Sequence, residues 1–278
     1  MAKHTAKKQM KDLEETAKFL RKQYKRIPQI GIVLGSGLGK FTGEIEVEKE
    51  VPYGDIPHFP VSTVEGHSGR LIFGKLGGKT VVAMAGRFHY YEGYRPQDVV
   101  FPIRVMKLLG VQTLLLSNAA GGVNPDFQVG DIMIITDHIS FFTLNPLVGE
   151  NIRQFGPRFP DMSEPYKKEL IVKAKQIAAE NEIDVKEGVY VAVTGPTFET
   201  HAEYRMINVI GGDVVGMSTV QESIVANHMG MDVFAVSVVT DIGIRETDNK
   251  ITHEEVLEAA NRAEPKLSLL FRQLVTSL

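Results

Sequence analysis

A glycine-rich segment follows an apolar, β-branched run early in the chain, in the stretch GIVLGSGLGK at residues 31–40. Such segments bring backbone N–H groups close to a phosphate, and Ser36, between two glycines, adds a hydroxyl donor. The spacing is G-x-G-x-G, which matches neither the dinucleotide-binding fingerprint nor the nucleoside-triphosphate loop. Residues 40–51 alternate like a strand, so we expect no helix to follow. By itself, the segment fits an anion site and a plain tight turn equally well.

Further potential anion donors stand near glycines or at the ends of predicted strands. Arg87 and His89 lie in GRFHYYEGY, directly after an apolar strand, and in an extended chain they face the same side. An arginine fork beside an imidazole suits phosphate. His67 lies between small residues in STVEGHSGR, and Ser218 precedes a predicted helix, whose N-terminus favours anions. Each fits an ordinary surface turn, but together with Ser36 they predict an oxyanion site.

The composition excludes several other kinds of site. The chain has 278 residues, 43% of them hydrophobic, and a formal net charge of −3, so no basic field indicates nucleic acid. It has no cysteine, which excludes disulfides, thiolate metal sites and a cysteine nucleophile. No H-E-x-x-H or clustered carboxylate–histidine spacing indicates a metal. The N-terminus has no apolar signal region and no segment is long enough to span a bilayer, so we expect a cytoplasmic protein without a membrane partner.

The hydrophobic pattern predicts alternating strands and helices that would position these residues. A hairpin is expected at 70–86, turning at Gly77–Gly78. Further strands are predicted at 29–36, 111–122, 131–140, 188–193, 211–218 and 232–240, and helices at 6–25, 99–110, 165–181, 200–210, 219–229 and 252–276. The segment 141–165 has no period, and loops of this length are usually functional. We therefore expect one α/β domain over 1–278, a central mixed β-sheet flanked by helices, with an N-terminal helix within 1–27 packed on it.

Several short motifs together resemble one enzyme family. In order between about residues 29 and 276 stand GSGLG, STVEGHSGR, GRFHYYEGY, SNAAGG, GPTFET and GMSTVQE. They are similar to the trimeric purine nucleoside phosphorylases and methylthioadenosine phosphorylases, and Glu199 resembles the first branch. The resemblance implies a nucleoside-phosphorylase-like fold and a homotrimer. It also implies phosphorolysis of purine ribo- or deoxyribonucleosides to free base and pentose 1-phosphate, with inorganic phosphate as co-substrate and no cofactor.

The resemblance further implies roles for individual residues. The phosphate would be bound by Ser36, His67, Arg87, His89, Ser218 and the backbone N–H of Ala119. The ribose would be contacted by Tyr91, Met217, His253 at the 5′-hydroxyl and, from a neighbouring subunit, Phe155. The base would be contacted by Phe198, Glu199 at its N1–H edge, Val215, Thr240 and Asp241. The catalytic groups among these would be His89, Glu199, Asp241 and His253.

Phosphorolysis needs residues of these types. Its transition state resembles an oxocarbenium ion, so a phosphate anion must be held against the ribose by cationic, hydroxyl and N–H donors. The leaving purine gains negative charge and needs preorganised hydrogen bonds. Neither a metal nor a covalent nucleophile is required.

One position departs from the family pattern. Asp241 stands where members specific for 6-oxopurines have asparagine. An ionised aspartate only accepts hydrogen bonds, which suits a 6-amino group, whereas a protonated one donates to N7. Glu199 favours guanine or hypoxanthine and Asp241 favours adenine. Our hypothesis is an enzyme for inosine and guanosine whose 6-oxo preference is relaxed toward adenosine.

Alternatives remain open from the sequence. Glu199 and His253 could be first-turn helix residues, and Phe198 and Met217 could be ordinary core. A methylthioadenosine phosphorylase would need an apolar pocket where His253 is expected. A catalytically silent protein that binds a nucleoside or phosphate is a further alternative. The glycine segment by itself also motivates a dinucleotide-dependent dehydrogenase.

Overall fold

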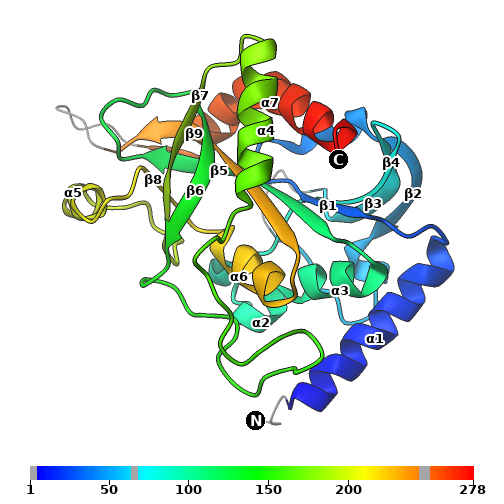
Figure 1. The fold of residues 1–278 in the computed structure, drawn as a ribbon. Coiled ribbons are helices and arrows are strands. Elements are labelled where there is room, and N and C mark those ends of the chain that lie inside the picture. Colours follow the sequence, from blue (N-terminus) through cyan, green and yellow to red (C-terminus); the bar gives the residue numbers. More distant parts are fainter. Residues whose placement is uncertain (1–4, 64–67, 244–250) are drawn as a thin grey trace.

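The computed structural model describes residues 5–63, 68–243 and 251–278. In this part of the chain a single mixed sheet of nine strands has the order β2-β3-β4-β1-β5-β8-β7-β6-β9. A further pairing of β5 with β9 closes the last five strands of this order into a ring (Figure 1). The strands are β1 Ile30–Val33, β2 Glu46–Pro52, β3 Arg70–Leu76, β4 Lys79–Ala85, β5 Thr113–Gly122, β6 Ile132–Ile139, β7 Val185–Ala192, β8 Val214–Gly216 and β9 Asp232–Ile242.

Helices cover the sheet on two sides. Figure 1 shows α4 and α7 gathered on one side and α1, α2, α3 and α6 on the other. The helices are α1 Ala6–Gln23, α2 Pro96–Val99, α3 Phe101–Leu109, α4 Lys168–Glu180, α5 His201–Val209, α6 Val220–His228 and α7 His253–Thr276, with short 3-10 turns η1 Gly39–Glu44, η2 Tyr53–Asp55 and η3 Tyr90–Glu92. None of the helices in the described ranges is long and apolar enough to cross a membrane.

Local sequence explains where the main helices begin and end. The hydroxyl of Thr5 accepts from the backbone N–H of Lys8 at the start of α1, and Thr252 and Glu255 form a reciprocal capping box at the start of α7. Helix α3 stops at Gly110, whose φ of +116° lies in the region that favours glycine. The apolar face of α1 is buried and packs against α3.

The strands that lead to the site are buried and mostly parallel. β1 pairs in parallel with β4 and β5, and β5 pairs in parallel with β9. β1 is buried throughout, as expected for a strand covered on both faces. The carboxyl ends of these strands therefore lie at one edge of the sheet, where α/β proteins bind ligands.

The expected fold class, one α/β domain with a mixed sheet flanked by helices, is confirmed. The β3–β4 hairpin turns at Gly77 and Gly78, both with positive φ. Some local expectations are wrong. The 3-10 turn η1 follows the glycine segment, because Phe41 turns inward to pack on Phe271 at 5.9 Å before the alternating strand β2 begins. β7 begins three residues earlier than predicted, at Val185, whereas α4 and β8 each begin three residues later, at Lys168 and Val214.

Candidate active site

One cavity lies at the carboxyl ends of β1, β4, β5 and β9. The chain after β1 contributes Ser36, and the chain after β4 contributes Arg87 and His89. β5 contributes its own last residues, and β9 contributes Thr240 and Asp241. The structure brings thirteen of the predicted residues together around it: Ser36, Arg87, His89, Tyr91, Ala119, Phe198, Glu199, Val215, Met217, Ser218, Thr240, Asp241 and His253.

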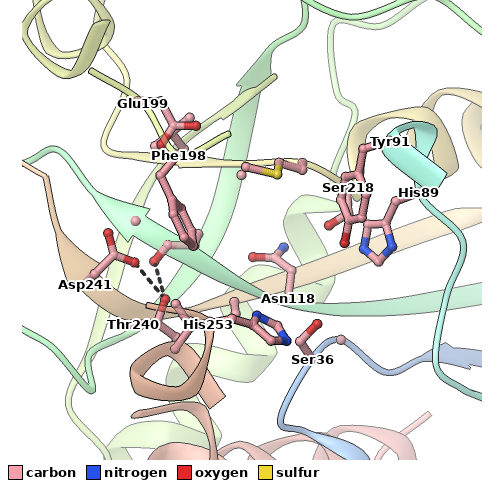
Figure 2. Close-up of a pocket in the computed structure, with 18 of the residues that line it drawn as sticks. Ser36, His89, Tyr91, Asn118, Phe198, Glu199, Ser218, Thr240, Asp241 and His253 are labelled. Atoms are coloured by element: carbon pink, nitrogen blue, oxygen red, sulfur yellow. Dashed lines mark hydrogen bonds between the residues drawn. The ribbon is translucent and has the colours of Figure 1, made fainter. Parts of the chain in front are cut away.

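The lining residues separate into two ends. Figure 2 shows Ser218, His89 and Tyr91 on one side of the cavity and Phe198, Glu199, Thr240 and Asp241 on the other, with Asn118 and His253 between them. We call the first the oxyanion end, made by Ser36, Arg87, His89, Ala119 and Ser218. We call the second the base end, made by Phe198, Glu199, Val215, Thr240 and Asp241.

Arg87 at the oxyanion end is held rigidly by a buried carboxylate. Its Nε and Nη2 donate to the two carboxylate oxygens of Glu222, at 3.1 and 2.7 Å, and Nη1 donates to the carbonyl of Ser117. Arg87 and Glu222 are only 1% and 2% exposed. Gly35 makes room for this arrangement, because a Cβ there would stand 2.8 Å from the Ser117 carbonyl and 3.3 Å from Arg87 Nη1. The guanidinium is therefore fixed before any ligand binds.

His89 is oriented by Glu92, three residues further on. Nδ1 of the imidazole lies 3.1 Å from Glu92 Oε1, and that oxygen also accepts the backbone N–H of His89 at 2.8 Å. The ring stacks on Tyr91 at 4.7 Å. Burial lowers the pKa of His89, and the hydrogen bond to Glu92 opposes that shift only in part.

Ser218 stands where the predicted helix begins. It directly precedes Thr219, the N-cap residue of α6, and its backbone N–H donates to the hydroxyl of Tyr190 at 3.2 Å. Thr219 has a φ of +69° and its hydroxyl accepts from Asn118 Nδ2 at 2.9 Å. These bonds fix the turn that presents Ser218 to the cavity.

Two carboxyl groups line the base end. The hydroxyl of Thr240 donates to Asp241 Oδ1 at 3.0 Å, and Asp241 is buried. Burial raises the pKa of Glu199; a hydrogen bond from Tyr204 opposes this, and the charge of Asp241 adds to it. A Cβ at position 121 would lie 2.9 Å from Asp241 Oδ2, so Gly121 leaves room for the aspartate.

Three further lining residues, assigned to neither end, suit a sugar. Tyr91, Met217 and His253 all line the cavity. His253 is the first residue of α7, directly after its N-cap, so it is a first-turn residue and a cavity residue at once. Burial raises the pKa of Tyr91 to about 12, which keeps its hydroxyl a hydrogen-bond donor at neutral pH.

The alternatives that Glu199 is only a first-turn helix residue, and that Phe198 and Met217 are only core residues, are wrong. Glu199 precedes the N-cap Thr200 and lies outside the first turn of α5. Phe198 is 41% exposed and Met217 is half-buried, so neither is ordinary core.

Known proteins resemble this chain over nearly its whole length. A family model described as the phosphorylase superfamily matches residues 29–276. A relative from Geobacillus stearothermophilus named purine nucleoside phosphorylase 1 is 52% identical over 266 residues, covering 96% of this chain and 97% of its own. This chain belongs to the purine nucleoside phosphorylases of the phosphorylase superfamily.

Solved structures of this family share the fold. A purine nucleoside phosphorylase from Schistosoma mansoni in complex with adenosine superposes with a TM-score of 0.93 at 45% identity, covering 99% of both chains. A Schistosoma purine nucleoside phosphorylase in complex with guanosine gives 0.90 at 44% identity, covering 99% of this chain and 98% of that one.

Two residues expected from the family resemblance are not among the described residues that line the cavity. His67 lies outside the described residues. Phe155 is buried elsewhere in the chain, with the guanidinium carbon of Arg104 5.2 Å from its ring centre, and it is not among the described residues that line the cavity. In this family the expected role of Phe155 is in a neighbouring subunit, so its place within one chain does not test that role.

Sequence reasoning missed three residues that complete the site. Glu92 and Glu222 hold His89 and Arg87, and Asn118 lines the cavity with a buried Oδ1 that has no hydrogen-bond partner in the described ranges. Glu92 and Glu222 stand inside the motifs GRFHYYEGY and GMSTVQE. For Glu92 the available signal was an acidic residue close to the basic donors Arg87 and His89 in one motif, whereas no local signal marks Glu222.

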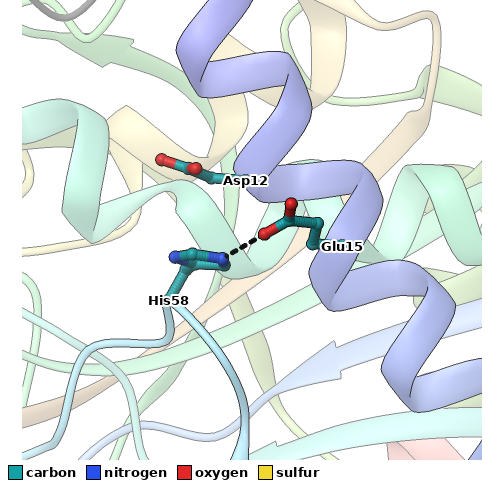
Figure 3. A group of neighbouring side chains, drawn as sticks. All are labelled: Asp12, Glu15 and His58. Atoms are coloured by element: carbon teal, nitrogen blue, oxygen red, sulfur yellow. Dashed lines mark hydrogen bonds and ion pairs between the residues drawn. The ribbon is translucent and has the colours of Figure 1, made fainter.

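A separate group of side chains has the composition of a metal site. Asp12, Glu15 and His58 place one ligand atom each within 4.8 Å of one another, on α1 and the loop after η2 (Figure 3). Glu15 already pairs with His58 at 2.9 Å, and Asp12 pairs with Lys8 at 2.6 Å. None of the three lines the cavity described above. That the reaction at the candidate active site requires no metal stays a prediction.

Proposed function

We propose that this chain cleaves purine ribo- and deoxyribonucleosides with inorganic phosphate, giving the free base and pentose 1-phosphate. The observation that carries the proposal is one cavity with oxyanion donors at one end and carboxyl groups suited to a purine edge at the other. Curated relatives at this level of identity are named purine nucleoside phosphorylases. The fixed Arg87–Glu222 pair fits an enzyme that must hold an anion in one position.

The oxyanion end holds the phosphate against the ribose. Arg87, Ser36, Ser218 and the backbone N–H of Ala119 donate to phosphate oxygens, in the same cavity as the ribose residues. As the glycosidic bond breaks, positive charge grows on the ribose, and an anion held beside it stabilises that charge and then captures C1′. Positioning of this kind converts a bimolecular encounter into an effectively unimolecular step.

Three further lining residues hold the ribose. In this proposal His253, the first residue of α7, contacts the 5′-hydroxyl, and Tyr91 and Met217 contact the sugar from the segments that follow β4 and β8. A polar group at the 5′ position disfavours the methylthioadenosine alternative, because a methylthio group requires an apolar pocket there.

The base end holds the purine and stabilises it as it leaves. An ionised Glu199 accepts the N1–H of hypoxanthine or guanine, whereas a protonated Glu199 donates to the unprotonated N1 of adenine. The raised pKa of Glu199 brings its protonated form closer to neutral pH. Asp241 accepts from a 6-amino group. We therefore propose inosine and guanosine as substrates, with adenosine accepted in addition.

We propose that the active form is a homotrimer in which Phe155 reaches the cavity of a neighbouring subunit. Supporting this, the loop that carries Phe155 exposes large apolar side chains, with Phe141 91% and Phe159 87% exposed. A light-scattering mass three times that of the 30.8 kDa chain would agree, and a monomeric mass would contradict it. The cytoplasmic location and the absence of nucleic-acid partners stay predictions from the sequence.

The test is the release of free base from inosine, guanosine and adenosine, each with and without phosphate. Release that depends on phosphate supports the proposal. No release from any of the three would instead favour a silent nucleoside-binding protein, and cleavage of methylthioadenosine far faster than of inosine would favour the related branch. Binding of a nicotinamide dinucleotide in a titration would support the dehydrogenase alternative.

A further inference from the structure

Two arginines of the described ranges are buried, and their surroundings differ. Arg87 forms two hydrogen bonds with the carboxylate of Glu222. Arg104 on α3 is only 7% exposed, yet its guanidinium forms no hydrogen bond or ion pair with any described residue, and its Nη1 is fully buried. Its guanidinium carbon lies over the ring of Phe155, 5.2 Å from the ring centre. A buried cation without an acceptor is destabilising, so Arg104 needs a partner that the described chain does not supply.

No carboxylate of the described chain acts as a counter-ion for Arg104. Burial lowers the pKa of Arg104 to about 10, and no negative charge opposes that shift. Arg95, by contrast, pairs with Asp98, whose hydrogen bond raises the pKa of Arg95. The charge of Arg104 contributes to the lowered pKa of His228, so this neighbour is a neutral imidazole at pH 7. One positive charge therefore stays uncompensated at neutral pH.

Arg104 lines a cavity that is separate from the candidate active site. This cavity lies between α1, α2, α3 and the loop 146–152, and none of its described lining residues lines the active-site cavity. Its volume of about 140 Å³ gives room for a small polar group and some water. The lining also includes Gln9 and Gln97, whose side-chain amides can donate hydrogen bonds.

The loop that closes the cavity is held in place without a bond to Arg104. Nε2 of Gln97 donates to the carbonyl of Val148 at 3.1 Å. Glu150, whose carboxylate lines the same cavity, accepts the backbone N–H of Ala6 at the start of α1, at 3.0 Å. The walls are thus fixed in advance, and the carboxylate of Glu150 is directed to α1 instead of pairing with Arg104.

We propose that this cavity binds a carboxylate group, which accepts hydrogen bonds from the guanidinium of Arg104. A planar guanidinium matches the two oxygens of a carboxylate. A single negative charge balances the uncompensated charge of Arg104, whereas a dianion would bring a second negative charge close to Glu150. The group has two sources with the same chemistry: a small carboxylate in solution, or an aspartate or glutamate of a second copy in the proposed homotrimer. The experiment distinguishes them.

The first arm measures the melting temperature of the full-length protein while sodium acetate replaces sodium chloride at constant ionic strength. A ligand that binds only the folded protein raises this temperature, by about 2–4 °C when acetate is present at about ten times its dissociation constant. Arg104→Met keeps the length of the side chain but removes the charge, so it should lose the acetate shift. Arg104→Lys keeps the charge without the planar fork and should retain a smaller shift.

The second arm measures the mass by light scattering over a dilution series. If the carboxylate belongs to a second copy, acetate causes no shift, and Arg104→Met dissociates at about ten- to hundredfold higher protein concentration than the wild type, because a charge-assisted hydrogen bond is lost. Arg262→Met is the matched control in both arms. It removes an exposed guanidinium that pairs with Glu258 on α7, and it should behave as the wild type.

Either result supports a carboxylate on Arg104 and identifies its source. The inference is overturned if the wild type shows no acetate shift and Arg104→Met dissociates within threefold of the wild-type concentration. An acetate shift that Arg104→Met retains in full would overturn it as well. Phosphate-dependent release of base from inosine is measured in parallel, and its absence would refute the proposed function while leaving this inference intact.

Discussion

Exchange of Asp241 for asparagine should shift the substrate preference further toward 6-oxopurines and away from 6-aminopurines. Asparagine has the same shape, so it fits beside Gly121, where space is limited. Its Oδ1 can still accept from Thr240, as that of Asp241 does at 3.0 Å. Its amide nitrogen then replaces Oδ2 and presents a donor to the 6-substituent.

The size of the effect follows from the hydrogen bond that changes. A hydrogen bond to a charged group contributes about 1.5–3 kcal/mol, so adenosine should lose about 10- to 150-fold in kcat/KM. The kcat/KM for inosine should stay the same or rise, because its 6-oxo group then faces a hydrogen-bond donor instead of a carboxylate. The ratio of the two kcat/KM values should therefore shift by about 100-fold.

The assay is chromatographic measurement of hypoxanthine and adenine released with and without phosphate. Asp184→Asn removes an exposed carboxylate that pairs with nearby Lys186, and it should leave the ratio unchanged. If Asp241→Asn leaves the ratio within threefold of the wild type, Asp241 does not contact the 6-position and the assignment of the base end is wrong.

Four further predictions follow from the same site. Burial raises the pKa of Glu199, and adenosine needs its protonated form, so the rate on adenosine relative to inosine should rise as the pH falls toward that pKa; a flat ratio from pH 8 to 5 would contradict this. Glu222→Ala leaves the buried Arg87 without its carboxylate and should cost about 3–5 kcal/mol of unfolding free energy, measured by denaturant titration, and raise the KM for phosphate; an unchanged midpoint would refute the buried pair. Phe155→Ala should lower kcat/KM about three- to tenfold without lowering phosphate affinity, and equal kinetics would remove Phe155 from the site. Dialysis against a chelator should leave turnover unchanged, and activity that returns only on adding a metal ion would show a cofactor.

The sequence predicted the elements of the site well, because strong local signals mark them. The buried strands, the Gly77–Gly78 hairpin and the end of α3 at Gly110 each depend on a few neighbouring residues. A run of apolar β-branched residues that ends at glycine predicts a strand and a close approach of the backbone. Donors at such ends then meet at one edge of the sheet, because the strands are parallel.

The partners of those donors could not be predicted, since they depend on tertiary contacts. Arg87 and Glu222 are 135 residues apart in the sequence, and nothing local in either motif indicates that they pair. Residues 40–51 show the same limit. Their alternating pattern predicts a strand throughout, but the contact of Phe41 with Phe271 in the last helix makes the first part of this segment a 3-10 turn. Local patterns locate elements, whereas the electrostatic state of a site depends on contacts between them.

The balanced charge of the oxyanion end is consistent with catalysis as well as binding. An uncompensated arginine would bind phosphate strongly in the ground state and in the transition state alike, and binding that is equal in both does not accelerate the chemical step. With Arg87 neutralised by Glu222 and His89 oriented by Glu92, the site instead holds its polar groups at fixed positions. Such preorganised groups favour the geometry in which the phosphate oxygen approaches C1′. Because they do not bind the anion by excess charge, pentose 1-phosphate dissociates more easily after the reaction.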